Sequence, residues 1–290
     1  MTPLRRFEIH QPATASEASQ MLAHYSEEAG VYAGGTELLL AMKHEALNYR
    51  HLIDVKTIPG LSSIAKSNGD VEIGAAATHR AIERSPLVRE KLPVLAELEA
   101  RVANVRVRAT GTLGGNLCFA EPHSDPATLL LILGGCAKIE GSAGPREIRI
   151  EEFIAGPYTN ALAPGEILTG IRVPCAKPNQ RMAYLKFQVH ERPTLGLGLL
   201  LETPDNGRTF SSARVAIGCV CPSPTRVPQA EELLIGPRAD VEKRVIDAAG
   251  LIADGADLAD DQEGSADYKR NLIRVFLGRA FRKALGEDSQ

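Results

Sequence analysis

The sequence contains no tryptophan, few aromatic residues and no excess of positive charge. Aromatic residues make up 4% of its 290 positions, and its formal net charge at pH 7 is −3. Single-stranded nucleic acids stack on aromatic side chains, and nucleic acids in general are bound through clustered Lys and Arg. We therefore expect no nucleic-acid partner.

Long apolar runs are also missing. The most apolar segment, DPATLLLILGG (125–135), is well short of the ~20 residues that a membrane-spanning helix needs. The amino-terminal residues MTPLRRFEIHQPAT lack the apolar core of a signal peptide. We expect a soluble, cytoplasmic protein without a membrane span.

Cysteine is sparse and scattered. The five cysteines include no CxxC pair, which argues against a disulfide framework. Cys219 and Cys221, in AIGCVCPSP, would share one face of a strand, where they either pack as small apolar residues or contribute to a metal site. Because no His or Cys is near them in the sequence, we predict no metal in this chain.

The pattern of apolar residues predicts a chain that contains both helices and strands. A capping box, Thr14 with Glu17, opens a helix that has an apolar face. Strands and helices follow, and the helix predicted near 85–102 is interrupted at Pro93. A polar segment at 175–181 precedes three strands of an antiparallel sheet and three helices. The last helix has Ser265 as its predicted N-cap and an apolar face formed by Ile273, Phe276, Leu277, Ala280, Phe281 and Ala284.

Two glycine-rich segments, 33–37 and 111–116, each follow one apolar segment and precede another. Neither is a GxGxxG fingerprint, and neither has the GK[ST] of a P-loop. Glycine lets backbone N–H groups approach phosphate oxygens closely, and Thr36 and Thr112 could add hydroxyl donors. Tight structural turns explain such segments equally well, so both interpretations stay open at this point.

A resemblance to a known family is carried by six segments in order, which cover nearly the whole chain. They are similar to the FAD-binding subunit of molybdenum hydroxylases, a family that includes the medium subunit of aerobic carbon monoxide dehydrogenase and the FAD domain of xanthine dehydrogenase. The segments are YAGGTELLLAMK (32–43), GAAATHRAIERSPLV (74–88), RATGTLGGNLCFAEPHSDPATLLLILGG (108–135), GEILTGIRVP (165–174), YLKFQVHER (184–192) and DYKRNLIRVFLGRAF (267–281).

The resemblance implies a two-part FAD-binding domain of the vanillyl-alcohol-oxidase (PCMH) type over 1–176, with subdomains of roughly 1–56 and 57–176. A smaller α+β domain over 177–290, an antiparallel sheet with helices, would follow. Both glycine segments would hold the diphosphate. The residues that the resemblance places at FAD are Ala33, Gly34, Gly35, Thr36, Glu37, Thr78, Gly111, Thr112, Gly114, Gly115, Asn116, Asp125, Leu168 and Lys186.

Some of these residues have implied roles of their own. Asp125 would accept a hydrogen bond from a hydroxyl-rich part of FAD, Leu168 would meet the adenine through its backbone, and Lys186 would lie near the isoalloxazine ring. Each also has an ordinary alternative. Asp125 could cap the next helix, Lys186 could be a solvated lysine, and Glu37 could be a helix-start acid stabilised by the helix dipole. A flavin that passes electrons needs no protein base, so we predict no catalytic residue and leave out His79 and His123.

The implied function is that of an electron-transfer subunit. A large molybdopterin-binding subunit and a small subunit with two [2Fe-2S] clusters would be its partners, in a dimer of heterotrimers. Electrons would reach the FAD of this chain and leave for an external acceptor. We expect no extra iron–sulfur cluster, and we expect Gly35→Val or Gly114→Val to abolish FAD retention while sparing the fold. The alternatives are a stand-alone flavin oxidoreductase and a cofactor-free assembly protein.

Overall fold

The structure, a computed structural model, describes residues 4–287, which form two compact units. The first unit contains the residues up to 120 together with 135–174, and the second contains 121–134 together with the residues from 175 onward. The sequence analysis assigns 121–134 to the first domain, whereas its packing groups it with the carboxyl-terminal part. Within the described residues, no helix combines the length and the apolar character that crossing a bilayer requires.

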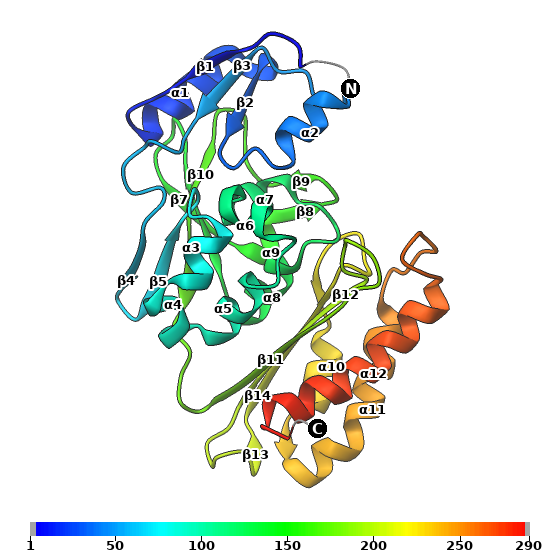
Figure 1. Ribbon diagram of the computed structural model, residues 1–290. Coiled ribbons are helices and arrows are strands. Elements are labelled where there is room, and N and C mark those ends of the chain that lie inside the picture. Colours follow the sequence, from blue (N-terminus) through cyan, green and yellow to red (C-terminus); the bar gives the residue numbers. More distant parts are fainter. Residues whose placement is uncertain (1–3, 288–290) are drawn as a thin grey trace. The chain divides into compact units, whose positions relative to one another are not determined.

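A three-stranded parallel sheet, in the order β1–β3–β2, opens the first unit (Figure 1). Helix α1 packs against β2 and β3. The Thr14 hydroxyl accepts a hydrogen bond from the Glu17 N–H at 3.1 Å, and the Glu17 carboxylate accepts one from Ala13, one residue before the N-cap. The predicted helix and its apolar face are thus confirmed. The elements are β1 (Glu8–His10), α1 (Ala15–Tyr25), a 3-10 turn (Ser26–Glu28), β2 (Ala29–Tyr32), α2 (Leu38–Lys43) and β3 (His51–Asp54).

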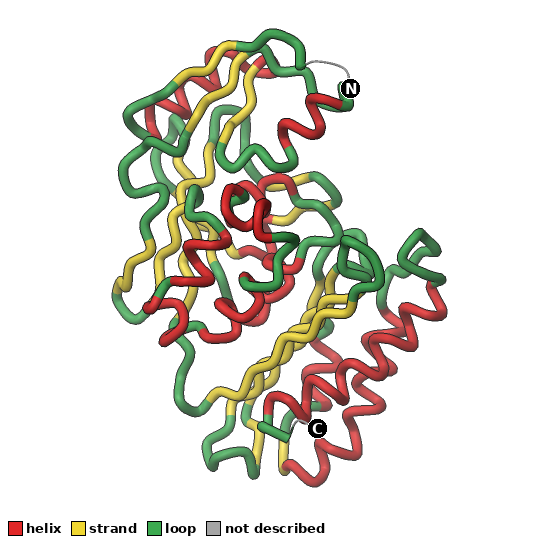
Figure 2. The backbone as a smooth tube through the Cα atoms, in the orientation of Figure 1, coloured by secondary structure: helices red, strands yellow, loops and turns green. Residues whose placement is uncertain are grey.

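The rest of the first unit is a five-stranded antiparallel sheet in the order β4–β5–β10–β6–β7, accompanied by short helices (Figure 2). Pro86 and Pro93 each begin a helix, so the predicted interruption at Pro93 is confirmed. The strands of the five-stranded sheet are β4 (Ile64–Ser67), β5 (Asp70–Gly74), β6 (Cys136–Glu140), β7 (Arg146–Arg149) and β10 (Ile167–Pro174), and β8 (Ile154–Gly156) and β9 (Thr159–Asn160) form a separate two-stranded sheet. The helices are α3 (His79–Arg84), α4 (Pro86–Lys91), α5 (Pro93–Glu99), α6 (Val105–Thr110), α7 (Leu113–Phe119) and α9 (Ile150–Phe153).

The second unit has an antiparallel sheet in the order β11–β12–β14–β15, with helices packed on both of its faces. The Ser265 hydroxyl caps α12, and the predicted apolar face of that helix is buried. The α+β fold class, with its antiparallel sheet plus helices, is confirmed. The elements are α8 (Asp125–Leu133), β11 (Gln180–Phe187), β12 (Leu195–Glu202), β13 (Thr209–Phe210), β14 (Ser212–Gly218), β15 (Thr225–Arg226), α10 (Pro228–Leu233), β16 (Gly236–Pro237), α11 (Arg238–Gly255) and α12 (Ala266–Ala284).

Helix α8 is mostly apolar, and all nine of its residues, including Asp125 and Thr128, are buried. It packs against β12 and β14, where glycines replace larger side chains. A Cβ on Gly198 would lie 3.0 Å from Ile132, and one on Gly218 would lie 1.9 Å from the Thr128 hydroxyl. The alternate leucines of β12 join the core with α10, α11 and α12. Its glycines therefore leave room for α8 on the opposite face.

The structure corrects two details of the sequence analysis. The second glycine segment is not an open loop, because Gly114 and Gly115 belong to the first turn of α7. Cys219 and Cys221 lie beyond β14, which ends at Gly218, so they do not share a strand face. Both thiols are buried. Burial raises the pKa of Cys221 to about 12 and raises that of Cys219 well above its usual value, which keeps both thiols protonated at neutral pH.

Candidate functional site

The first glycine segment forms the turn between β2 and α2. Gly35 has a φ of +71°, a left-handed conformation that glycine adopts without strain. A Cβ on Gly34 would lie 2.3 Å from the Thr110 carbonyl oxygen and 2.7 Å from the Cα of Gly111. Gly34 is therefore required where the two glycine segments touch, and Gly35 is required by the turn itself.

Unused hydrogen-bond donors distinguish this turn. Within residues 4–287, the backbone N–H groups of Gly34, Gly35, Thr36 and Glu37 have no acceptor, although all four residues are partly buried. Half-buried N–H groups normally find a partner in the protein, in water or in a ligand. Successive N–H groups in a turn of this kind form an anion-binding concavity. Glu37 occupies the N-cap of α2 without making a side-chain capping bond, so its carboxylate is not used as a cap.

The second glycine segment uses its donors internally. The N–H groups of Leu113 and Gly114 donate to the carbonyls of Ala77 and Ala75, at 3.1 and 3.0 Å. Gly115 N–H donates to the Thr112 hydroxyl, and Asn116 N–H donates to the Thr112 carbonyl. What the segment presents to a ligand is mainly the bare surface of Gly115, which is exposed and has no side chain.

The two adjacent glycines of α7 have different surroundings. Gly114 is buried, and a Cβ there would lie 2.5 Å from the Ala75 carbonyl oxygen. Gly115 is exposed, and a Cβ there would meet only the Thr112 hydroxyl within 4 Å. A side chain at Gly114 would press against main chain, and one at Gly35 would have to adopt a left-handed φ of +71°. The expectation that Gly114→Val and Gly35→Val spare the fold stays a prediction, and both substitutions carry a cost in stability of their own.

Backbone hydrogen bonds connect the second segment to the other predicted residues of the first unit. Thr78 forms a β-bridge with Thr112, and the Thr78 hydroxyl caps α3. Ala75 makes two backbone hydrogen bonds. Its carbonyl accepts from the Gly114 N–H, and its own N–H donates to the Thr169 carbonyl at 3.0 Å. Leu168, the neighbour of Thr169, is buried in β10. The structure thus brings the two glycine segments and Thr78 together, with Leu168 in the strand behind.

A buried hydrogen-bonded pair, His79 with Glu99, supports this arrangement. His79 Nδ1 lies 2.6 Å from Glu99 Oε2, and both side chains are almost fully buried. The His79 backbone N–H donates to the Gly111 carbonyl at 3.1 Å. Because Glu99 fixes the His79 side chain, the pair also holds the start of the second segment in place. The sequence analysis left His79 out and did not single out Glu99. The two residues are 20 positions apart and form no motif, so no sequence signal connects them.

Asp125 and Lys186 meet in the second unit. Lys186 Nζ lies 2.7 Å from Asp125 Oδ2, and the lysine side chain is 7% exposed. The Tyr184 hydroxyl donates to Asp125 Oδ1 at 2.8 Å, and burial followed by the Asp125 charge raises the pKa of Tyr184. Asp125 therefore does not cap α8, whose N-cap is Ser124, and Lys186 is not a solvated lysine. The sequence analysis did not single out Tyr184. Its position two residues before Lys186 in a predicted strand was the available signal, because such residues share one face of a strand.

Comparison with known families covers most of the chain. Residues 5–176 match the family described as "FAD binding domain in molybdopterin dehydrogenase", and residues 184–284 match the "CO dehydrogenase flavoprotein C-terminal domain". These two matches agree with the resemblance found in the sequence.

Individual relatives match almost end to end. The chain is 31% identical to the carbon monoxide dehydrogenase medium chain of Afipia carboxidovorans, over 96% of each chain. It is 30% identical to the nicotine 6-hydroxylase medium subunit of Paenarthrobacter nicotinovorans, over 94% of this chain and 95% of the relative. A solved structure of carbon monoxide dehydrogenase from Hydrogenophaga pseudoflava superposes with a TM-score of 0.92 at 30% identity, covering 99% of this chain and all of the other.

Proposed function

The chain belongs to the family of FAD-binding subunits of molybdenum hydroxylases, and we propose that it carries electrons between a partner's [2Fe-2S] clusters and an external acceptor. Its proposed partners are a large molybdopterin-binding subunit and a small iron–sulfur subunit, in a dimer of heterotrimers. The medium-chain naming of its relatives supports such partners. Bound FAD would supply the electron-transfer chemistry, and this chain would bind and orient it. The functional division of the chain is proposed to fall near residue 176.

The observation that carries this proposal is the set of unused N–H donors at Gly34, Gly35, Thr36 and Glu37. We propose that these four groups, with Ala33 beside them and the Thr36 hydroxyl, bind the diphosphate of FAD. A diphosphate is doubly charged and rich in acceptors, which suits clustered donors without side chains in the way.

The second segment has a different proposed part in binding. Gly115 and Asn116 would contact the diphosphate and the nearby ribityl chain, because Gly115 has no Cβ and is exposed. Gly111, Thr112 and Gly114 would act by holding that surface in place. Thr78 would line the cofactor, and Leu168 would contact the adenine through its backbone.

Asp125 and Lys186 remain proposed cofactor contacts, as a pair with compensated charge. The ion pair at 2.7 Å combines an acceptor for a sugar hydroxyl with an ammonium donor, and it adds no net charge. Removing either partner would leave the other buried and unpaired, which is costly. The two residues would therefore position FAD by hydrogen bonding.

Substrate choice is proposed to lie in the partner subunits. This chain is about equally similar to subunits of enzymes named for carbon monoxide and for nicotine, at 31% and 30% identity. A chain that contacted the organic substrate would be expected to resemble one of these more than the other. We accordingly assign no residue here to the substrate.

A reconstitution experiment tests the proposal. The chain is purified and loaded with FAD, and its flavin absorbance near ~450 nm is followed after addition of the reduced, desalted iron–sulfur partner. Rapid bleaching, followed by recovery when NAD+, oxygen or a quinone is added, is the expected result. Turnover of an organic substrate by the chain alone would indicate a stand-alone oxidoreductase. A chain that takes up no FAD would indicate an assembly protein.

A further inference from the structure

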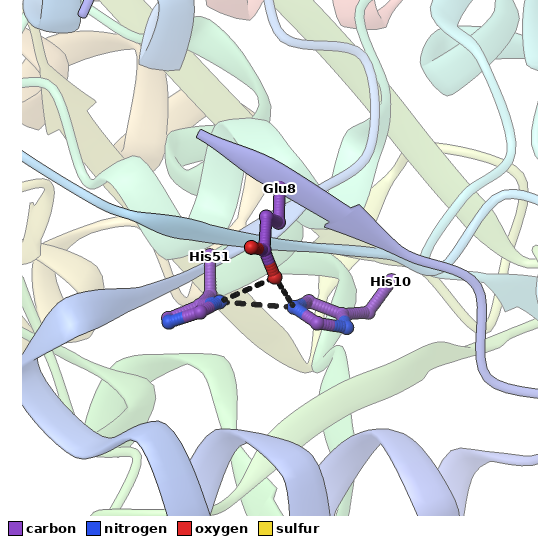
Figure 3. Close-up of side chains that lie close together, drawn as sticks. All are labelled: Glu8, His10 and His51. Atoms are coloured by element: carbon purple, nitrogen blue, oxygen red, sulfur yellow. Dashed lines mark hydrogen bonds and ion pairs between the residues drawn. The ribbon is translucent and has the colours of Figure 1, made fainter. Parts of the chain in front are cut away.

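Three potential metal ligands meet on the parallel sheet of the first unit: Glu8, His10 and His51 (Figure 3). Glu8 and His51 are paired in adjacent strands, and His10 lies two residues beyond Glu8 on the same face. Glu8 and His51 begin their strands, whereas the first glycine segment follows the end of β2. The group is therefore separate from the proposed FAD-binding turn.

The distances between the three ligand atoms suit a single small cation. His10 Nε2 lies 3.0 Å from His51 Nδ1, and Glu8 Oε2 lies 4.0 and 3.8 Å from those two nitrogens. A point roughly 2.1 Å from all three atoms exists within this triangle, and that is the length of a zinc–nitrogen or zinc–carboxylate bond. In Figure 3 the carboxylate of Glu8 points toward the gap between the two imidazole rings. Within residues 4–287, it is the only group of three or more His, Cys, Asp or Glu with such convergence.

An aromatic side chain holds both imidazoles in place. Tyr25, the last residue of α1, stacks on His51 with ring centroids 3.9 Å apart and on His10 at 4.9 Å. The two histidine side chains are 19% and 18% exposed, whereas that of Glu8 is 75% exposed. The two nitrogen ligands are thus fixed before any metal arrives, and the carboxylate side leaves a path for entry from solvent.

We propose that Glu8, His10 and His51 bind one divalent transition-metal ion of the Zn²⁺ type. Two imidazoles and one carboxylate are donors that such ions accept, with water completing the coordination. The ion would join β1, an edge strand, to the central strand β3, and so would fasten the amino-terminal strand to the sheet. All three ligands belong to this chain, so binding of the ion would depend neither on FAD nor on the partner subunits.

The test measures Zn²⁺ binding to the full chain directly. Protein freed of metal by a chelator is dialysed against Zn²⁺, and bound zinc is measured for the wild type, His10→Gln, His51→Gln and Glu8→Gln. The wild type should bind one ion per chain. Loss of an imidazole should weaken binding at least as much as the roughly 10–100-fold that loss of an outer partner costs. Zn²⁺ should raise the melting temperature of the wild type and leave those of His10→Gln and His51→Gln unchanged.

A matched control is provided by His24, an exposed histidine that also contacts the Tyr25 ring. His24→Gln should bind zinc as the wild type does. The exposed Glu8 allows Glu8→Gln to test the site without disturbing packing, and circular dichroism checks the fold of every variant. The proposal is overturned if the wild type binds no zinc above background, or if His24→Gln weakens binding as much as His10→Gln.

Discussion

The two glycine segments are alike in sequence, but their backbone N–H groups differ in whether they have acceptors within the protein. In the first segment, residues 34–37 leave four N–H groups without an acceptor among the described residues. In the second, the N–H groups of Leu113, Gly114, Gly115 and Asn116 are all bound within the protein. In the proposed function, the first segment would donate hydrogen bonds to FAD, and the second would present its surface to the cofactor. Glycine thus has two roles in what looks like one repeated motif: it permits a left-handed turn at Gly35 and a close approach to main chain at Gly114.

The largest effect is expected from removing the anchor of the second segment. His79→Leu leaves the carboxylate of Glu99 buried without its partner, which costs about 3–5 kcal/mol. Urea unfolding followed by circular dichroism should show this loss, together with weaker FAD retention. The double variant His79→Leu/Glu99→Leu should recover much of the stability, because no charge is then left unpaired. A single variant as stable as the wild type would show that the pair does not anchor the segment.

Substitutions at Gly114 and Gly115 separate packing from ligand contact. Gly114→Val forces side-chain atoms against the Ala75 backbone and should lower stability by about 1–3 kcal/mol. Gly115→Ala places a Cβ 2.8 Å from the Thr112 hydroxyl that caps α7, so this hydroxyl must shift. The preference of helices for alanine over glycine, about 1 kcal/mol, offsets part of that cost, and Gly115→Ala should lower stability less than Gly114→Val does. Its added methyl group should nevertheless weaken FAD affinity about tenfold, or ~1.4 kcal/mol. Fluorescence titration with FAD and thermal melting measure the two effects.

The outcome that contradicts this assignment is specific. If Gly115→Ala binds FAD as tightly as the wild type, the exposed surface of α7 does not face the cofactor. If Gly114→Val melts like the wild type, the close approach to Ala75 is not a constraint on the sequence.

Amide hydrogen exchange compares the two segments directly. The amides of 34–37 should exchange quickly in FAD-free protein and slow by about tenfold or more when FAD binds, as free donors gain acceptors. The amides of 113–116 should exchange slowly in both states, because their hydrogen bonds exist without ligand. The contrast between the segments would disappear if 34–37 were already protected in the FAD-free chain.

The smallest effect concerns the contribution of Glu121, two residues beyond the end of α7, to stability in acid. Burial alone would raise the pKa of Glu121, but hydrogen bonds from His123 and the charge of Arg192 outweigh it and lower the pKa below the usual 4.5. A carboxyl group with a lowered folded pKa adds stability above its unfolded value, and that stability is lost as the pH falls through the folded pKa. Arg192→Gln should therefore cost about 0.2–1 kcal/mol at pH 7 and little at pH 3. An equal cost at both pH values would exclude the ion pair as its source.

The sequence alone was enough to predict the elements whose signals are local. The capping box of Thr14 with Glu17, the N-cap at Ser265, the apolar faces of α1 and α12 and the interruption at Pro93 depend on residues close together in the sequence, and each was confirmed. The two glycine segments could also be marked as candidate ligand loops. The order of six segments, these two among them, carried the family resemblance, and the matches over 5–176 and 184–284 confirm it.

What could not be predicted depends on contacts between distant positions. Nothing in the sequence shows that Gly34 touches Gly111, that Gly114 packs against Ala75, or that His79 pairs with Glu99. The group of Glu8, His10 and His51 needs the parallel pairing of β1 with β3, which a sequence pattern does not specify. Whether a glycine is free to meet a ligand or is already in contact with main chain becomes visible only in three dimensions.

The placement of α8 limits where the chain can be divided into fragments that fold separately. Because 121–134 belongs to the second unit while the residues on either side of it belong to the first, the chain passes between the units at three points, after 120, after 134 and after 174. A fragment ending near residue 174 would carry the mostly apolar helix α8 without its partner strands β12 and β14. The two units are therefore poor candidates for separate expression or for exchange between homologues as cassettes. An exchange that respects the fold must move residues 121–134 with the carboxyl-terminal part.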